Sequence, residues 1–306
     1  MKTAFLFPGQ GAQYVGMGFD FAECFPEAKN VFKQAENALD SAFVDIIFNG
    51  PEEKLKLTRY TQPAILTASH AIYTVLQKSG ISPDAVAGLS LGEYTALVAA
   101  GSISFEDALP LVQKRGIFMQ DAVAPGEGTM VAIMGLSQYK VEEICSTAAE
   151  IGTVSPANYN CPGQIVISGN MEAVHRAIDL AGKAGAKKIT ELKVSAPFHC
   201  SLLKPVEEKL EDELRKIKIN KPVMPIIFNV SAAYADQPDM IKDNLVRQVS
   251  NPILWEQSIK KLIDSGIKRF ISLGPGNSLA RLMKRIAPQL KTISIEKPED
   301  LEKVNN

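Results

Sequence analysis

The stretch from Gly88 to Gly92 reads Gly-Leu-Ser-Leu-Gly, the pattern of a nucleophile elbow with Ser90 at its centre. An apolar run at residues 84–87 precedes it, and residues 93–100 follow it with helical spacing, which predicts a strand, a tight turn and a helix. Glycines on both sides of the serine permit a turn too sharp for larger side chains. The free N–H groups at the start of the helix would stabilise negative charge on a substrate oxygen. The pattern therefore predicts Ser90 as a nucleophile.

A serine hydroxyl needs a base within hydrogen-bond reach, usually a histidine, and the chain has three. His175 lies on the polar face of a predicted helix and His70 among aliphatic residues of another, which favours a structural role for each. His199 follows a predicted strand in a loop, where rigid scaffolds place catalytic groups. We therefore expect His199 to be the base. Cys200 beside it is a weaker candidate nucleophile, because no elbow surrounds the thiol.

A hydrolase triad would also contain a carboxylate between the serine and the histidine in chain order. The acids in that interval lie in predicted helices or linkers, where each is adequately explained as a solvent-exposed charge. They include Asp107, Asp121, Glu172 and Asp179. The sequence offers no convincing third member, which leaves a backbone carbonyl as the alternative partner of the imidazole.

Arg115 lies late in a helix predicted at residues 105–123, among apolar neighbours. Two interpretations are open from spacing alone. The side chain either lies along the surface with its charge in water, or forms a fork that binds a substrate carboxylate through two parallel hydrogen bonds.

The composition limits the class of protein. The chain has 306 residues, of which 46% are hydrophobic and 22% charged, and a formal net charge of −1, so we expect a globular protein without a general attraction to nucleic acid or to an anionic membrane. The first apolar run ends at Pro8 and is too short for a signal peptide or a membrane span, which predicts a cytoplasmic protein. The four cysteines lack metal-ligand spacing, so we expect reduced thiols and no metal site.

The order of predicted elements indicates two units. Residues 128–196 read strand, helix, strand, strand, helix, strand, which is the ferredoxin-like order. The flanking segments, residues 1–127 and 197–306, alternate strands and helices and predict an α/β core with a mainly parallel sheet. In the first segment we expect helices at residues 21–39 and 64–76. Ligands of such a sheet bind at the carboxyl ends of its strands.

Seven short motifs, in order along nearly the whole chain, resemble those of malonyl-CoA:acyl-carrier-protein transacylases. They begin at Phe7, Thr61, Gly88, Gln113, Ser195, Gln248 and Gly274. The resemblance implies an α/β-hydrolase-like core with a ferredoxin-like insert, in agreement with the element order.

By this resemblance Ser90 attacks the malonyl thioester of coenzyme A, and His199 takes the serine proton. The phosphopantetheine thiol of an acyl carrier protein then removes the malonyl group from Ser90, which is a ping-pong scheme. The resemblance assigns the oxyanion hole to the backbone N–H groups of Leu91 and Gln10. Coenzyme A enters as part of the substrate, and no further cofactor is implied.

The resemblance also implies how the substrate is held. Arg115 falls on the carboxylate-binding arginine of the family, and the main-chain carbonyl of Gln248 on the partner of the histidine. Met119 and Asn160 are expected to line the pocket. Phe198 resembles the bulky residue of malonyl-selective enzymes, where it would crowd a methyl branch at a cost of about 1–3 kcal/mol.

One residue departs from the family pattern. The position before the nucleophile most often holds a histidine in the family, and here it is Leu89. We expect Leu89 to point away from the exposed face of the elbow and to change the packing behind the serine.

Two rival functions remain from the sequence. A serine esterase or thioesterase would share Ser90 and His199 but gives Arg115 no role. A non-catalytic module that binds acyl carrier protein would need only a basic surface, for which the candidates are Lys187, Lys188, Arg281 and Arg285; these charges are equally explained as solvated faces. We expect malonyl-CoA and an acyl carrier protein as partners, neither nucleic acid nor membrane, and a monomer.

Overall fold

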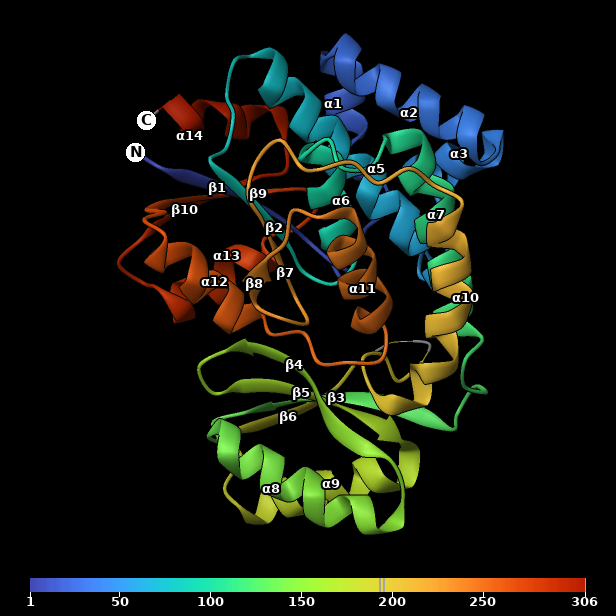
Figure 1. The fold of residues 1–306 in the computed structure, drawn as a ribbon, viewed down its shortest axis with the longest axis vertical. Helices are drawn as coiled ribbons and strands as arrows, with labels where there is room; N and C mark the ends of the chain where they lie inside the picture. The colour runs from blue at the N-terminus through green and yellow to red at the C-terminus, as the bar shows by residue number, and fades with distance from the viewer. Residues whose placement is uncertain (193, 195, 306) are drawn as a thin grey trace.

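Two β-sheets, each packed against helices, make up the fold (Figure 1). The computed structural model describes residues 1–192, 194 and 196–305. The larger sheet lies in the upper part of Figure 1 and the smaller one below it, with α8 and α9 outermost. Among the residues described, no helix combines the length and the apolar character needed to cross a membrane.

The larger sheet has six strands in the order β10-β9-β1-β2-β7-β8, and all neighbours are parallel except β7 and β8. Alternate side chains of β1 enter two different cores: Phe5 and Phe7 the larger, Ala4 and Leu6 the smaller. Burial on both faces explains why the central strands read as continuous apolar runs. The strands are β1 (Thr3–Phe7), β2 (Ala85–Gly88), β7 (Ile226–Phe228), β8 (Ala233–Tyr234), β9 (Arg269–Leu273) and β10 (Lys291–Ile295).

Helices cover both faces of this sheet. The larger core takes apolar side chains from α1 (Phe19–Cys24), α2 (Pro26–Ala38), α3 (Ser41–Asn49), α4 (Glu52–Leu55), α5 (Thr58–Lys78), α6 (Gly92–Ala99), α7 (Phe105–Gln120), α10 (Lys204–Arg215), α11 (Pro238–Gln248) and α14 (Glu302–Asn305). The smaller core takes them from α12 (Trp255–Asp264) and α13 (Ser278–Ile286). Short 3₁₀ turns occupy η1 (Ala149–Ile151), η2 (Ser201–Leu203) and η3 (Pro298–Leu301).

The smaller sheet is antiparallel, in the order β4-β5-β3-β6. Its elements are β3 (Gly128–Met134), α8 (Gln138–Ala148), β4 (Val154–Cys161), β5 (Gln164–Asn170), α9 (Met171–Lys183) and β6 (Lys188–Glu191). Val131 and Ile133 pack with α8 and α9, whereas Met130 and Ala132 of the same strand join the larger core. The fold class expected from the sequence, a mainly parallel α/β core with a ferredoxin-like insert, is therefore confirmed; the domain boundaries at residues 127 and 196 stay a prediction.

Several expected element boundaries were wrong. The helix expected at residues 21–39 is two helices, because Pro26 starts a new one after Phe25. Helices α3 and α4, between residues 40 and 57, were not predicted from the sequence. Helix α5 begins at Thr58 and contains Pro63. Proline has no N–H, so the helix loses one backbone hydrogen bond there. Burial of most of the helix offsets this loss. The last strand of the segment expected at residues 128–196 ends at Glu191, and residues 193 and 195 lie outside the described part of the chain.

The elbow between β2 and α6 leaves no space for a side chain at its glycines. A Cβ on Gly88 would lie 1.9 Å from the carbonyl carbon and oxygen of Gly92, and a Cβ on Gly92 would lie 2.1 Å from the carbonyl oxygen of Phe7. These contacts are with backbone, which cannot move without shifting a strand. Glycine is therefore required at positions 88 and 92, because the neighbouring backbone leaves no room for a Cβ atom at either.

We predict that Gly88→Ala destabilises the protein by about 3 kcal/mol or more, because the added methyl group meets rigid backbone. Gly182→Ala is the matched control: it lies in α9 with no atom within 4 Å of its Cβ position, and it should stabilise by up to about 1 kcal/mol through helix propensity. Midpoints of urea unfolding measure both. Equal midpoints for the two variants would contradict the close-approach argument.

Candidate active site

Ser90 stands at the turn between β2 and α6 in a left-handed backbone conformation, with φ of +52°. This region is costly for a residue with a side chain, and such strain is typical of functional sites. Two hydrogen bonds hold the residue there. The Ser90 N–H donates to Oδ1 of Asn229 at 2.6 Å, and Nε2 of Gln248 donates to the Ser90 carbonyl oxygen at 3.1 Å.

His199 lies beside Ser90, with 2.8 Å between Nε2 and the serine Oγ. Its Nδ1 is 2.7 Å from the carbonyl oxygen of Gln248. Because a carbonyl oxygen can only accept, Nδ1 carries the proton, and in the neutral ring Nε2 is free to accept the proton of Ser90. The carbonyl of Gln248 thus occupies the place of a triad carboxylate.

Burial, and after it the charge of Arg115, lowers the pKa of His199 to about 3, although the hydrogen bond to Gln248 acts in the opposite direction. The ring is therefore neutral at pH 7 and can accept a proton. His70 is stacked on Phe105 at 4.7 Å between ring centroids and is a structural residue, and His175 is exposed on α9. The thiol of Cys200 is buried and donates to the carbonyl of Pro197 at 3.2 Å, which leaves it no role as a nucleophile.

Arg115 is fully buried, so the interpretation of a surface arginine is wrong. Its Nη1 donates to Oε1 of Gln62 at 2.7 Å, and its Nη2 donates to Oε1 of Gln248 at 2.8 Å and to Oγ of Ser90 at 3.2 Å. The guanidinium carbon lies 5.3 Å from the ring centre of Tyr94. Burial lowers the pKa of Arg115, against the charges of Tyr94 and Glu93. A positive charge therefore lies directly next to the Ser90 hydroxyl.

Gln10 and Leu91 line the same cavity as Ser90 and His199. Within the described part of the chain neither of their backbone N–H groups has a protein acceptor, whereas the Ser90 N–H is bonded to Asn229. The loop of Gln10 approaches the elbow closely, since a Cβ on Gly9 would lie 2.4 Å from the carbonyl oxygen of Leu89. This geometry fits two donors for a substrate oxyanion.

These groups open into a cavity of about 440 Å³ between the two sheets. Gln10, Leu91, Met119 and Phe198 line it as expected, together with Gly9, Gly11, Gln13, Lys56, Gln62, Leu89, Ser90, Met130, Asn158, Leu192, Val194 and His199. Arg115 and Gln248 are fully buried and are not part of its wall.

Two expectations about this wall need correction. Asn160 does not line the cavity; Asn158 does, because β4 is irregular between Pro156 and Asn158 and again between Tyr159 and Cys161. Leu89 does not point wholly away from the site. It is half-buried, packs against the smaller core and also lines the cavity.

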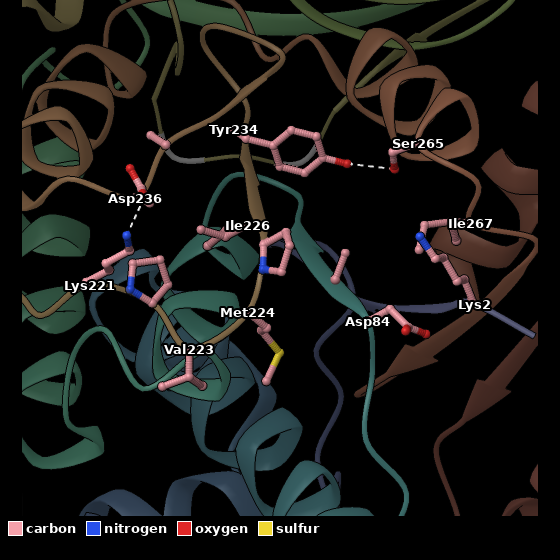
Figure 2. Close-up of a pocket in the computed structure, with 14 residues that line it drawn as sticks. Lys2, Asp84, Lys221, Val223, Met224, Ile226, Tyr234, Asp236, Ser265 and Ile267 are labelled. Carbon is pink, nitrogen blue, oxygen red and sulfur yellow. Dashed lines mark hydrogen bonds and ion pairs between the residues drawn. The ribbon is translucent and has the colours of Figure 1, made fainter.

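A second cavity, of about 570 Å³, lies at the opposite, amino ends of the strands (Figure 2). Four of its polar side chains form two pairs: Lys221 pairs with Asp236 at 2.8 Å, and the Tyr234 hydroxyl bonds Ser265 at 2.9 Å. Ligands of open parallel sheets bind at the other end of the strands.

Three residues that hold the site were missed by the sequence analysis: Asn229, Gln62 and Glu93. Asn229 directly follows β7, and a polar residue at the carboxyl end of a strand beside the elbow is the signal that could have found it. Glu93 is fully buried in the first turn of α6, and its Oε2 accepts the Asn229 N–H at 2.6 Å. Burial raises the pKa of Glu93 to about 8, against the neighbouring Asn229, Arg115 and Gln248.

The comparisons with known proteins agree with this geometry. The chain matches the acyl transferase domain family over residues 4–296. It is 46% identical to the malonyl CoA-acyl carrier protein transacylase of Bacillus subtilis, over 98% of this chain and 95% of the other, and 46% identical to that of Escherichia coli strain K12, over 97% and 96%.

Solved structures are equally similar. An acyl carrier protein S-malonyltransferase from Vibrio cholerae superposes with a TM-score of 0.97 at 42% identity, over 99% of this chain and 100% of the other. The malonyl-transacylase in a complex with AntF, a holo type II PKS acyl-carrier protein, superposes with a TM-score of 0.98 at 40% identity, over 100% of both chains. The chain therefore belongs to the acyl transferase domain family and, within it, to the family of malonyl CoA-acyl carrier protein transacylases.

Proposed function

We propose that this protein transfers the malonyl group of malonyl-CoA to the phosphopantetheine thiol of an acyl carrier protein, through an ester on Ser90. The observation that carries the proposal is the buried guanidinium of Arg115, 3.2 Å from the serine Oγ. A cation held there fits a substrate whose acyl group ends in a carboxylate, and simple ester hydrolysis gives it no role. The names of the relatives support the same substrates.

In the first half-reaction Oγ of Ser90 attacks the thioester carbonyl carbon while its proton passes to Nε2 of His199. The carbonyl oxygen becomes an oxyanion that the N–H groups of Leu91 and Gln10 bind. When this intermediate collapses, the carbon–sulfur bond breaks and His199 returns the proton to the departing thiolate. Malonyl-Ser90 and free coenzyme A result.

In the second half-reaction the carrier thiol gives its proton to His199 and attacks the ester carbonyl. The same two donors hold the oxyanion, and Ser90 leaves with the proton from His199. Protein groups and the two thiols supply this chemistry, so we propose that no further cofactor takes part. The groups all come from one chain, which fits action as a monomer, and the four free cysteines fit a cytoplasmic location.

The cavity wall suggests the acyl selectivity. Phe198 and Met119 are almost fully buried and occupy the wall next to the serine, where a branched acyl chain would need space. We propose that they favour malonyl over methyl-branched donors, with a discrimination of about 1–3 kcal/mol.

We propose that the carrier protein docks on the exposed basic residues Lys187, Lys188, Arg281 and Arg285. Lys187 packs over Gly135, whose N–H bonds the carbonyl oxygen of Gly163 at 2.9 Å, and Arg285 bonds the carbonyl oxygen of Pro162 at 2.8 Å. Lys187 and Arg285 thus flank the same pair of turns, and we propose that they form one positive patch with Lys188 and Arg281. Such a patch would attract an acidic carrier.

The first prediction tests the covalent intermediate. Incubation with malonyl-CoA should add one malonyl group to Ser90, seen by intact mass and peptide mapping. Holo acyl carrier protein should remove it quickly and water slowly. Ser90→Ala should take up no malonyl group. Rapid hydrolysis that ignores the carrier would instead favour the esterase.

The second prediction concerns Arg115. Arg115→Ala should slow malonyl transfer about 10- to 100-fold more than acetyl transfer, because hydrogen bonds to charged groups contribute about 1.5–3 kcal/mol. Acetyl transfer should slow as well, since Arg115 also bonds Ser90. Arg215→Ala, on an exposed arginine of α10, is the control. Equal losses with the two donors would count against the carboxylate fork.

The third prediction concerns pH. For a histidine with the ordinary pKa of about 6.5, the neutral fraction falls about 25-fold between pH 7 and pH 5. Because burial lowers the pKa of His199 to about 3, kcat/KM for malonyl-CoA should change less than about 2-fold over this range. Steady-state rates measure it, with His175→Gln as the control.

The same shift affects stability, and the two effects must be separated. Unfolded His199 binds a proton below about pH 6.5, whereas the native ring stays neutral to about pH 3. The contribution of neutral His199 to the free energy of unfolding is therefore fully present above about pH 6.5, and it declines as the pH falls from there toward pH 3. Rates must be corrected for the folded fraction, and a corrected 25-fold decline would contradict the third prediction.

A further inference from the structure

Asn229 lies beside the elbow because of the order of the strands. Strands β2 and β7 are parallel neighbours, with Val86 opposite Ile226 and Ala87 opposite Ile227. Continuing this register by two residues brings Asn229 opposite Leu89, next to Ser90. The side chain of Asn229 is fully buried.

One amide group spans the elbow. Oδ1 of Asn229 accepts the Ser90 N–H at 2.6 Å, and Nδ2 donates to the carbonyl oxygen of Gly88 at 2.7 Å. The Asn229 backbone is fixed in turn, since its N–H donates to Glu93 at 2.6 Å and its carbonyl accepts from Leu254 at 2.9 Å. The amide that holds the elbow is therefore itself held by α6 and by the segment before α12.

We propose that Asn229 is a positioning residue for the nucleophile: its amide holds Ser90 in the left-handed conformation and keeps the Ser90 N–H away from the substrate oxyanion. The inference rests on the proposed role of Ser90. It also explains why the proposed oxyanion donors are the N–H groups of Leu91 and Gln10, because the Ser90 N–H is already bonded to Asn229.

The chemistry requires an amide at this place. The elbow presents one donor, the Ser90 N–H, and one acceptor, the Gly88 carbonyl, so the side chain between them must accept with one atom and donate with the other. Alanine leaves both backbone groups buried without a partner. An ionised aspartate accepts from Ser90 but opposes the Gly88 carbonyl with its second oxygen. A protonated aspartic acid satisfies both again.

This property gives a test that a merely structural asparagine would not pass. The probe is a fluorophosphonate, which reacts with an activated serine and needs no malonyl group. The variants are N229A and N229D, with rates expressed per folded molecule. The charged or titratable groups in the same hydrogen-bond network are Glu93 on α6, which bonds the Asn229 N–H, and Arg115 on α7 and His199, which bond the Ser90 hydroxyl.

The matched control is Asn244 on α11. It is also a buried asparagine whose amide both donates and accepts, with bonds to the Met240 carbonyl at 2.7 Å and to the Ser231 hydroxyl at 2.9 Å. These bonds do not involve the elbow. N244A should lose stability and keep the rate at which Ser90 is labelled.

We expect N229A to label Ser90 at least tenfold more slowly than the wild type, and to lower kcat for malonyl transfer with little change in KM. N229D should be slow at pH 8 and recover as the pH falls to 5, because its carboxyl group takes up a proton in a buried site beside Glu93. The wild type should not accelerate over this range.

Three outcomes would overturn the inference. N229A and N229D could label Ser90 at the wild-type rate, or their labelling rate could fall no more than that of N244A. The labelling rate of N229D could also fail to recover at low pH. Failure of the wild type to label at Ser90 would overturn it as well. If N229A does not fold, the pH profile of N229D decides alone. A wild type that labels at Ser90 but takes up no malonyl group refutes the proposed function, and the comparison of variants still tests Asn229.

Discussion

The site depends on a buried positive charge. Removing a guanidinium from water is costly unless its hydrogen bonds are replaced. At Arg115 the replacement comes from two neutral amide oxygens, of Gln62 and Gln248, and from the face of Tyr94. Glu93 is near enough to influence the pKa of Arg115 but is not in contact, and its own pKa is raised by burial. The charge is therefore held in place without being neutralised, which suits a pocket for an anion.

Backbone strain is concentrated at two residues of the candidate site. Three non-glycine residues among those described have positive φ, and two of them are Ser90 and His199. Ser90 follows the carboxyl end of β2, and His199 lies beside it on the wall of the same cavity. The surrounding contacts hold the strain: close backbone packing at Gly88 and Gly92, the amide of Asn229, and the carbonyl of Gln248. The rigid parallel sheet thus fixes the geometry of two short loops.

Local patterns in the sequence were enough to predict Ser90 as the nucleophile and the outline of the smaller sheet. Ser90 was identified by glycines at fixed spacing, and the small sheet by strand and helix periodicity within a continuous segment. Asn229, Gln62 and Glu93 were missed because their roles depend on which distant segments become neighbours, such as β7 beside β2. Asn160 was misplaced for a related reason, since alternation along β4 is interrupted by its irregular register. The spacing of residues in the sequence predicts which face of a strand a side chain occupies only where the strand is free of bulges.

Gln248 is hydrogen-bonded to His199, Arg115 and Ser90 through three different atoms. Its carbonyl accepts from His199, its Oε1 accepts from Arg115 and its Nε2 donates to the Ser90 carbonyl. Burial is the main cause of the low pKa of His199, and the charge of Arg115 adds to it; in the proposed reaction a malonyl carboxylate at Arg115 would offset this second effect. Binding of the correct acyl group would then strengthen the base that activates Ser90, whereas an acetyl group would leave it weak. Selectivity for the carboxylate would in that case be exerted on the rate of attack as well as on affinity.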